Sequence, residues 1–123
     1  MEVILLDTNI LIEILKGNQK TIQQVESLHT TLYVSSITVM ELYYGALNKA
    51  EIKRLEKFIM LFTVLHIDKE ISIRSAELIK VYAKSHTLDI PDSLIAATAL
   101  EKELTLFTYN TKDFKYISHI KLL

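Results

Sequence analysis

The sequence predicts an α/β fold in which helices cover both faces of a parallel sheet. Short segments that are apolar at nearly every position alternate along the chain with longer segments whose apolar residues recur at helical spacing. A run that is apolar throughout is typical of a strand buried on both faces, as in a parallel sheet. Only one proline and two glycines interrupt the 123 residues. We therefore expect one domain over residues 1–123, without repeats or linkers.

The N-terminal half begins with an apolar run at residues 3–6, the first predicted strand. Apolar residues then resume at helical spacing and stop at Gly17, a residue that often ends helices. In order, this half is predicted to hold a strand at 3–6, helices at 10–15 and 20–28, a strand at 32–36, and helices at 38–47 and 50–61.

The C-terminal half continues the alternation. Pro91 suits the first position of a helix, because its missing N–H needs no partner there. The predicted elements are a strand at 63–67, helices at 70–85 and 91–102, a strand at 105–108, a helical turn at 112–116 and a short last strand at 120–123. The sheet is thus expected to have four to five strands.

Composition excludes several classes of protein. The chain has no cysteine, so disulfides, thiolate zinc sites and cysteine nucleophiles are ruled out, and a cytoplasmic location is expected. No apolar run approaches the ~20 residues that span a bilayer, and the N-terminus does not resemble a signal peptide. The formal net charge is −1, so any contact with nucleic acid needs a local patch or a bound cation.

Acidic side chains follow the ends of the predicted strands. Asp7 comes directly after the first strand, and Glu41 lies early in the helix after the second. Asp92 opens the helix before the strand at 105–108, and Asn110 and Asp113 follow that strand. In an open parallel sheet, ligands bind outside the carboxyl ends of the strands. We therefore expect these side chains to meet at one edge.

Each acid also has a purely structural explanation. Asp7 or Asn9 could cap the helix that follows. The segment 38–41 fits a capping box in which Glu41 bonds back to the backbone amide of Thr38. Asp92 is favoured at a helix start by the helix dipole. Taken together these explanations weaken, because clustered carboxylates repel one another unless a cation lies among them.

An all-oxygen cluster suits Mg²⁺ or Mn²⁺ rather than zinc. Such an ion lowers the pKa of water and stabilises charge on phosphate oxygens, so hydrolysis of a phosphate ester is the predicted chemistry. Asp68 also follows a predicted strand. We leave it out of the cluster because, assuming a flavodoxin-like strand order, the third strand lies away from the point where that order reverses.

Four segments, in order, resemble the PIN-domain ribonucleases, specifically the VapC-type toxins of VapBC toxin–antitoxin modules. They are "LLDTNILI" (5–12), "SSITVMELYYG" (35–45), "IPDSLIAATAL" (90–100) and "LFTYNTKDF" (106–114). The resemblance covers nearly the whole chain. It implies a three-layer α/β/α fold with a central parallel sheet.

The resemblance also implies Mg²⁺- or Mn²⁺-dependent hydrolysis of RNA, with tRNA or another structured RNA as the substrate. Asp7 and Asp92 match the two main metal-binding acids of the family, and Glu41 matches the glutamate of its T-x-x-E segment. Many PIN domains have aspartate at the position of Asn110, and Asp113 is the alternative fourth catalytic acid. A water activated at the metal would attack the phosphodiester in line.

Supporting roles are expected around these acids. Thr8, Asn9, Thr108 and Asn110 would orient the carboxylates, and Lys112 and Lys115 would contact the RNA backbone. The four histidines share no metal-ligand spacing and are interpreted as surface or structural residues. The family also implies a homodimer and a VapB-type antitoxin, and a toxin–antitoxin hetero-oligomer is the further assembly that it allows. Apolar residues in excess of one core-facing stripe at 10–15 and 39–61 fit such contacts.

Three other functions compete with this interpretation. A phosphatase or phosphotransferase with an aspartate nucleophile would usually have a second aspartate where Asn9 stands. A receiver-like signalling domain could use Asp68 as its phosphoacceptor, but it needs paired acids after the first strand, and Thr8 follows Asp7. A non-catalytic PIN-fold RNA-binding scaffold is supported only by Asn110.

Overall fold

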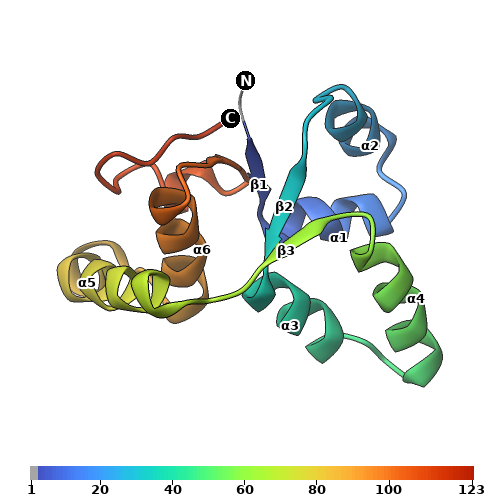
Figure 1. Ribbon diagram of the computed structural model, residues 1–123, viewed down its shortest axis with the longest axis horizontal. Helices are drawn as coiled ribbons and strands as arrows, with labels where there is room; N and C mark the ends of the chain where they lie inside the picture. The colour runs from blue at the N-terminus through green and yellow to red at the C-terminus, as the bar shows by residue number, and fades with distance from the viewer. Residues whose placement is uncertain (1–2) are drawn as a thin grey trace.

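The computed structural model describes residues 3–123 and consists of three layers (Figure 1). A parallel sheet lies in the middle, with α1 to α4 on one side and α5 and α6 on the other. The four strands are β1 (Ile4–Leu6), β2 (Leu32–Ser35), β3 (Thr63–Leu65) and β4 (Thr105–Phe107). The predicted α/β/α architecture is confirmed.

The strand order is β3-β2-β1-β4, and all three pairings are parallel. Ile4 of β1 faces Leu32 of β2 on one side and Thr105 of β4 on the other. The chain therefore adds β2 and β3 on one side of β1 before it returns to place β4 on the other. The strand order reverses between β1 and β4, and this is where ligands bind in open α/β sheets.

Helices connect every pair of consecutive strands. The β1–β2 and β2–β3 connections lie on one face, and the β3–β4 connection lies on the other (Figure 1). The helices are α1 (Thr8–Leu15), α2 (Gln19–Glu26), α3 (Ser36–Tyr44), α4 (Lys49–Ile59), α5 (Lys69–His86) and α6 (Ile90–Glu101), followed by the 3₁₀ turn η1 (Thr111–Asp113).

The central strand supplies the core on both faces. Ile4 and Leu6 pack into the cluster under α1 to α4, whereas Leu5 packs into the cluster under α5 and α6. This division follows from the alternation of side chains along a strand. Every residue of β1 and β4 is buried, which explains why the two runs are apolar or nearly so. Rigid strands buried in this way fix the positions of the residues that follow them.

Two details differ from the sequence predictions. The helix expected at 38–47 begins at Ser36, and Ser35 caps it by accepting from the amide of Ile37. The alternative that Glu41 forms a capping box with Thr38 is therefore wrong, because Thr38 lies inside the helix. The strand expected at 120–123 is only a single bridge between Leu106 and Leu122.

The assumed flavodoxin-like order is also wrong, since flavodoxin-like sheets have the order 2-1-3-4-5. The observed order nevertheless places β3 at the edge farthest from β4, as the exclusion of Asp68 required. Within residues 3–123, no helix is both long enough and apolar enough to cross a bilayer.

Candidate metal-dependent nuclease site

Asp7 is the buried centre of a hydrogen-bond network that joins β1, α1 and the segment after β4. It is only 5% exposed. Its Oδ1 accepts from the amide of Thr8 at 2.8 Å, and its Oδ2 accepts from Thr108 Oγ1 at 2.7 Å and from Asn9 Nδ2 at 3.2 Å. Burial raises the pKa of Asp7 above its usual value, while these hydrogen bonds oppose the shift and Glu41 adds to it.

The same network holds the neighbours of Asp7. Asn9 Nδ2 also donates to Thr108 Oγ1 at 3.2 Å, and Asn9 Oδ1 accepts from the amide of Tyr109 at 3.2 Å. The amide of Asn110 donates to Thr108 Oγ1 at 3.0 Å. Thr108 therefore connects the Asp7 carboxylate to the start of the segment that carries Asp113. Asp7 is also the N-cap residue of α1. The same carboxylate therefore caps a helix and belongs to the candidate site.

Glu41 reaches the same edge of the sheet from α3. Thr8 Oγ1 donates to Glu41 Oε1 at 2.7 Å and lies 2.9 Å from the hydroxyl of the buried Thr38. Thr8 can donate only one proton, so the Thr38 hydroxyl donates to Thr8 while Thr8 donates to Glu41. This chain of hydroxyls directs the exposed Glu41 carboxylate toward the start of α1.

Asp92 lies in the first turn of α6, and its surroundings disfavour the charged form of its carboxyl group. Burial raises its pKa from 3.8 to about 7, with further contributions from Asp89, Asp7, Asp113 and Glu41. Asp89 is the N-cap residue of α6, and its Oδ1 accepts from the amide of Asp92 at 2.9 Å. Four acids from four segments thus act on Asp92 at the carboxyl edge of the sheet.

Asp113 and Asn110 differ in their relation to this group. Asp113 lies at the end of η1 and is one of the acids that raise the pKa of Asp92. Asn110 precedes η1, is exposed and makes no side-chain cap. The structure therefore brings Asp113 to the acidic edge, whereas the contact of Asn110 with the network is through its backbone amide.

A hydrated cation fits this donor set. Within residues 3–123, none of the five acids forms an ion pair, and no three acidic or histidine side chains are placed so that they could hold a metal ion by themselves. Mg²⁺ keeps several waters and usually takes one or two carboxylates together with substrate phosphates. The raised pKa values of Asp7 and Asp92 mark the kind of site that such an ion would stabilise.

Lys112 and Lys115 flank Asp113 in the sequence, and both are exposed. In the described part of the chain, neither lysine forms an ion pair, although acids lie close by in the sequence. The two ammonium groups are therefore available to a polyanion that reaches the acidic edge.

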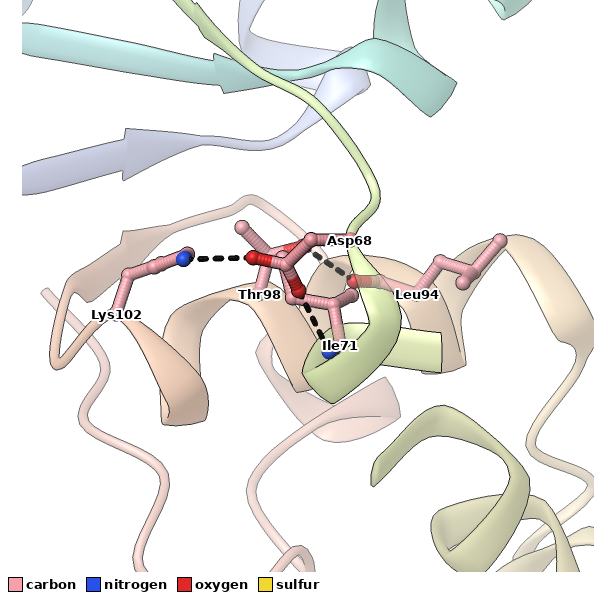
Figure 2. Close-up of polar contacts among 5 residues, drawn as sticks. All are labelled: Asp68, Ile71, Leu94, Thr98 and Lys102. Atoms are coloured by element: carbon pink, nitrogen blue, oxygen red, sulfur yellow. Dashed lines mark hydrogen bonds and ion pairs between the residues drawn. The ribbon is translucent and has the colours of Figure 1, made fainter. Parts of the chain in front are cut away.

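Asp68 is a different kind of acid (Figure 2). Its Oδ1 caps α5 by accepting from the amide of Ile71 at 2.9 Å, and its Oδ2 lies 2.8 Å from Lys102 Nζ. Lys102 and the cap lower the pKa of Asp68. Lys102 neutralises the charge of Asp68 within the protein, so the exclusion of Asp68 has a structural reason.

Sequence reasoning missed three residues beside the acids. A cavity of about 170 Å³ is lined by Asp92, Asp113, Asp89, His86 and Tyr116. Asp89 could have been found, because an acid three residues before Asp92 and two before Pro91 marks a helix start. His86 was interpreted as surface or structural, and no local pattern links it to Tyr116, thirty residues further on.

The fold and the site together define a class of α/β domains that gather acidic side chains at the carboxyl edge of a parallel sheet. The profile of the PIN domain matches residues 4–120. The chain therefore belongs to the PIN-domain family, as the four sequence segments predicted.

Its relatives are of the VapC type. The chain is 32% identical to the "tRNA(fMet)-specific endonuclease VapC" of Salmonella typhimurium, covering 96% of this chain and 94% of that protein. It is 35% identical to the "Ribonuclease VapC1" of Rickettsia felis, covering 98% and 94%. Within the PIN family this chain is a VapC-type ribonuclease toxin.

Solved structures of toxin–antitoxin complexes contain the same fold. DNA-bound VapBC from Salmonella typhimurium superposes with a TM-score of 0.85 at 31% identity, covering 100% of this chain and 98% of the other. A toxin–antitoxin complex from Klebsiella pneumoniae gives a TM-score of 0.79 at 34% identity, covering 94% and 93%.

Proposed function

We propose that this protein is a Mg²⁺- or Mn²⁺-dependent endoribonuclease that cuts tRNA, with initiator tRNA as the first substrate to test. The observation that supports it best is the unpaired group of acids around Asp92, whose pKa is raised to about 7. Structural acids are normally neutralised, as Asp68 is. The substrate follows from the printed activity of the Salmonella relative.

Asp7 and Asp92 would hold the ion, with Glu41 and Asp113 beside it. The ion, when bound, supplies a Lewis acid that activates water and stabilises charge on the phosphate. Asp7 is held by Thr108, Asn9 and the Thr8 amide, so its oxygens cannot turn away from the ion. A carboxylate of the group accepts the proton of the attacking water.

The two free lysines would hold the RNA backbone. Lys112 and Lys115 are exposed on the side of Asp113. Without the cation, five carboxylates would repel a phosphate, and two lysines would not offset them. The proposal therefore includes weak RNA binding by the metal-free protein.

An antitoxin would cover an apolar groove that leads to the same acids. A groove of about 300 Å³ between α1, α3 and α4 is lined by Ile12, Leu15 and Leu55 together with the charged Lys16, Glu41 and Glu51. Tyr44, at the end of α3, and Leu47, in the loop before α4, are 94% and 86% exposed. An apolar segment lying here would reach Glu41 and could block the metal site, and a homodimer would use other exposed apolar residues.

The test is cleavage of transcribed initiator tRNA(fMet), alongside total cellular RNA, by antitoxin-free protein with Mg²⁺, Mn²⁺ or EDTA. We expect discrete cuts that need the metal and disappear in Asp7→Asn and Asp92→Asn. The matched control is Asp68→Asn, the same change at an acid outside the group, and it should cut like the wild type. Absence of cleavage by folded, metal-loaded wild type would leave the non-catalytic scaffold as the better function.

A further inference from the structure

Two aromatic rings stack at the wall of the acidic cavity. The centroids of His86 and Tyr116 lie 4.1 Å apart with an angle of 9° between the ring planes. Both residues line the cavity of about 170 Å³ that also contains Asp92 and Asp113. The rings come from the last residue of α5 and from the segment after η1, so the fold, and not a local turn, brings them together.

Neighbouring residues hold the stack in place. Tyr82, one helical turn before His86, packs its edge against both rings, with centroids 5.1 Å from Tyr116 and 5.7 Å from His86. The Tyr82 hydroxyl accepts from the amide of Ser118 at 3.3 Å. Ser85 Oγ lies 2.8 Å from His86 Nδ1 and fixes the orientation of that ring. None of these contacts involves the acids.

A purely structural role does not explain the position of His86. Tyr82 and Tyr116 are half-buried, as expected of rings that join α5 to the C-terminal segment, but His86 is exposed. An exposed aromatic ring is accessible to another flat group.

Unpaired RNA bases are the flat groups that fit beside a phosphate-cleaving site. Proteins recognise unpaired RNA by stacking bases on aromatic side chains, including histidine. Such stacking tolerates any base, because every base has a π-face. The cavity is too small for a large ligand but adjoins the acids that would hold the phosphate.

We propose that the stacked His86 and Tyr116 rings bind the base of a nucleotide next to the scissile phosphate. The two residues position the RNA for cleavage and take no part in the chemical step. This inference rests on the proposed ribonuclease function, and it adds a subsite for an unpaired nucleotide. It places the cut in a loop or another single-stranded segment of the RNA.

The test measures kcat and KM for transcribed initiator tRNA(fMet) with antitoxin-free protein and Mg²⁺. Stacking of one base corresponds to at least about a fivefold change in binding. We expect His86→Leu and Tyr116→Leu to raise KM by about fivefold or more. The ring-preserving variants His86→Phe and Tyr116→Phe should stay within about twofold of the wild type. The control His66→Leu removes an exposed histidine that does not line the cavity.

A titration with Mn²⁺ and a thermal melt separate this role from a structural one. Unchanged Mn²⁺ affinity and melting temperature, with a raised KM, would support the subsite. If Tyr116→Leu does not fold, His86→Leu and His86→Trp still test the subsite, because His86 is exposed and its replacement should not affect folding. His86→Leu should raise KM, whereas His86→Trp, which supplies a larger ring, should keep KM low.

Three outcomes would overturn the inference. If the wild type cuts RNA and every Leu variant has the wild-type KM, the proposed subsite is wrong and the ribonuclease function still holds. A Leu variant that loses Mn²⁺ affinity would show that the rings only support the acids. Wild type that cuts no RNA would remove the proposed function, and the subsite with it.

Discussion

Asp68 and Asp92 both lie near the beginning of a helix on the same face of the sheet, yet their surroundings are opposite. Asp68 is satisfied by the α5 amides and by Lys102, and its pKa is lowered (Figure 2). Asp92 has four acids near it and forms no ion pair within residues 3–123, and its pKa is raised to about 7. A folded protein tolerates such an unpaired group where function needs it, and perturbed pKa values gather at functional sites for this reason.

The largest expected effect is on RNA cleavage. Asp7→Asn and Asp92→Asn each remove a charge that would hold the cation, so the rate should fall by at least about 100-fold. Asp68→Asn should keep nearly the wild-type rate, because asparagine also caps helices well. The measurement is the initial rate on initiator tRNA with Mg²⁺. Equal losses in all three variants would mean that the two kinds of acid do not differ in function.

The next effect is on metal affinity through Thr108. Thr108→Val removes the 2.7 Å hydrogen bond to Asp7 while keeping the side-chain shape. Loss of a group that orients a metal ligand typically costs about 10- to 100-fold in affinity or activity. A titration with Mn²⁺ measures it, with Thr98→Val as the control, because Thr98 is buried but bonds the Leu94 carbonyl of its own helix. Equal affinity in wild type and Thr108→Val would contradict the role of this network.

The fold could be predicted almost fully from the sequence, and the site only in part. Apolar runs and helical spacing located all four strands and six helices, because burial on two faces leaves a strong pattern. Asp7, Glu41 and Asp113 could be found because each comes soon after a strand, and Asp92 because it opens the helix that precedes the last strand. The direction of Glu41 could not be found, since it depends on Thr8, thirty-three residues away. The His86–Tyr116 pair likewise depends on tertiary packing.

In the absence of metal, Asp92 and Asp68 should contribute to the free energy of unfolding with opposite pH dependence. The pKa of Asp92 is higher in the folded state than in the unfolded state, so its contribution is present below about pH 4 and is lost as the pH rises through 7. At pH 8 without metal, Asp92→Asn should therefore be more stable than wild type, by about 1–3 kcal/mol after allowing for solvent screening.

Asp68→Asn should be less stable than wild type at the same pH, because the lowered pKa means that its charged form is favoured in the fold. Chemical unfolding of wild type, Asp92→Asn and Asp68→Asn at pH 5 and pH 8 with EDTA measures both effects. A pH-independent difference between wild type and Asp92→Asn would show that the Asp92 pKa is not raised.

The smallest expected effect is at Lys102. Lys102→Met removes the ion pair but leaves the Asp68 cap to Ile71 in place. Exposed ion pairs contribute about 0–1 kcal/mol, so the melting temperature should fall slightly and less at high salt. RNA cleavage should not change. A loss of cleavage would indicate that Asp68 and Lys102 belong to the site after all.

Calorimetric titration of the metal-free, antitoxin-free protein with Mn²⁺ at pH 7, in two buffers of different ionisation enthalpy, tests the central claim most directly. The account predicts binding with release of part of a proton, because Asp92 is about half protonated at this pH. Asp68→Asn should bind in the same way, and Asp92→Asn should bind weakly and release no proton. Absence of binding by wild type, or equal binding and proton release in Asp92→Asn, would contradict the claim that these acids form a cation site.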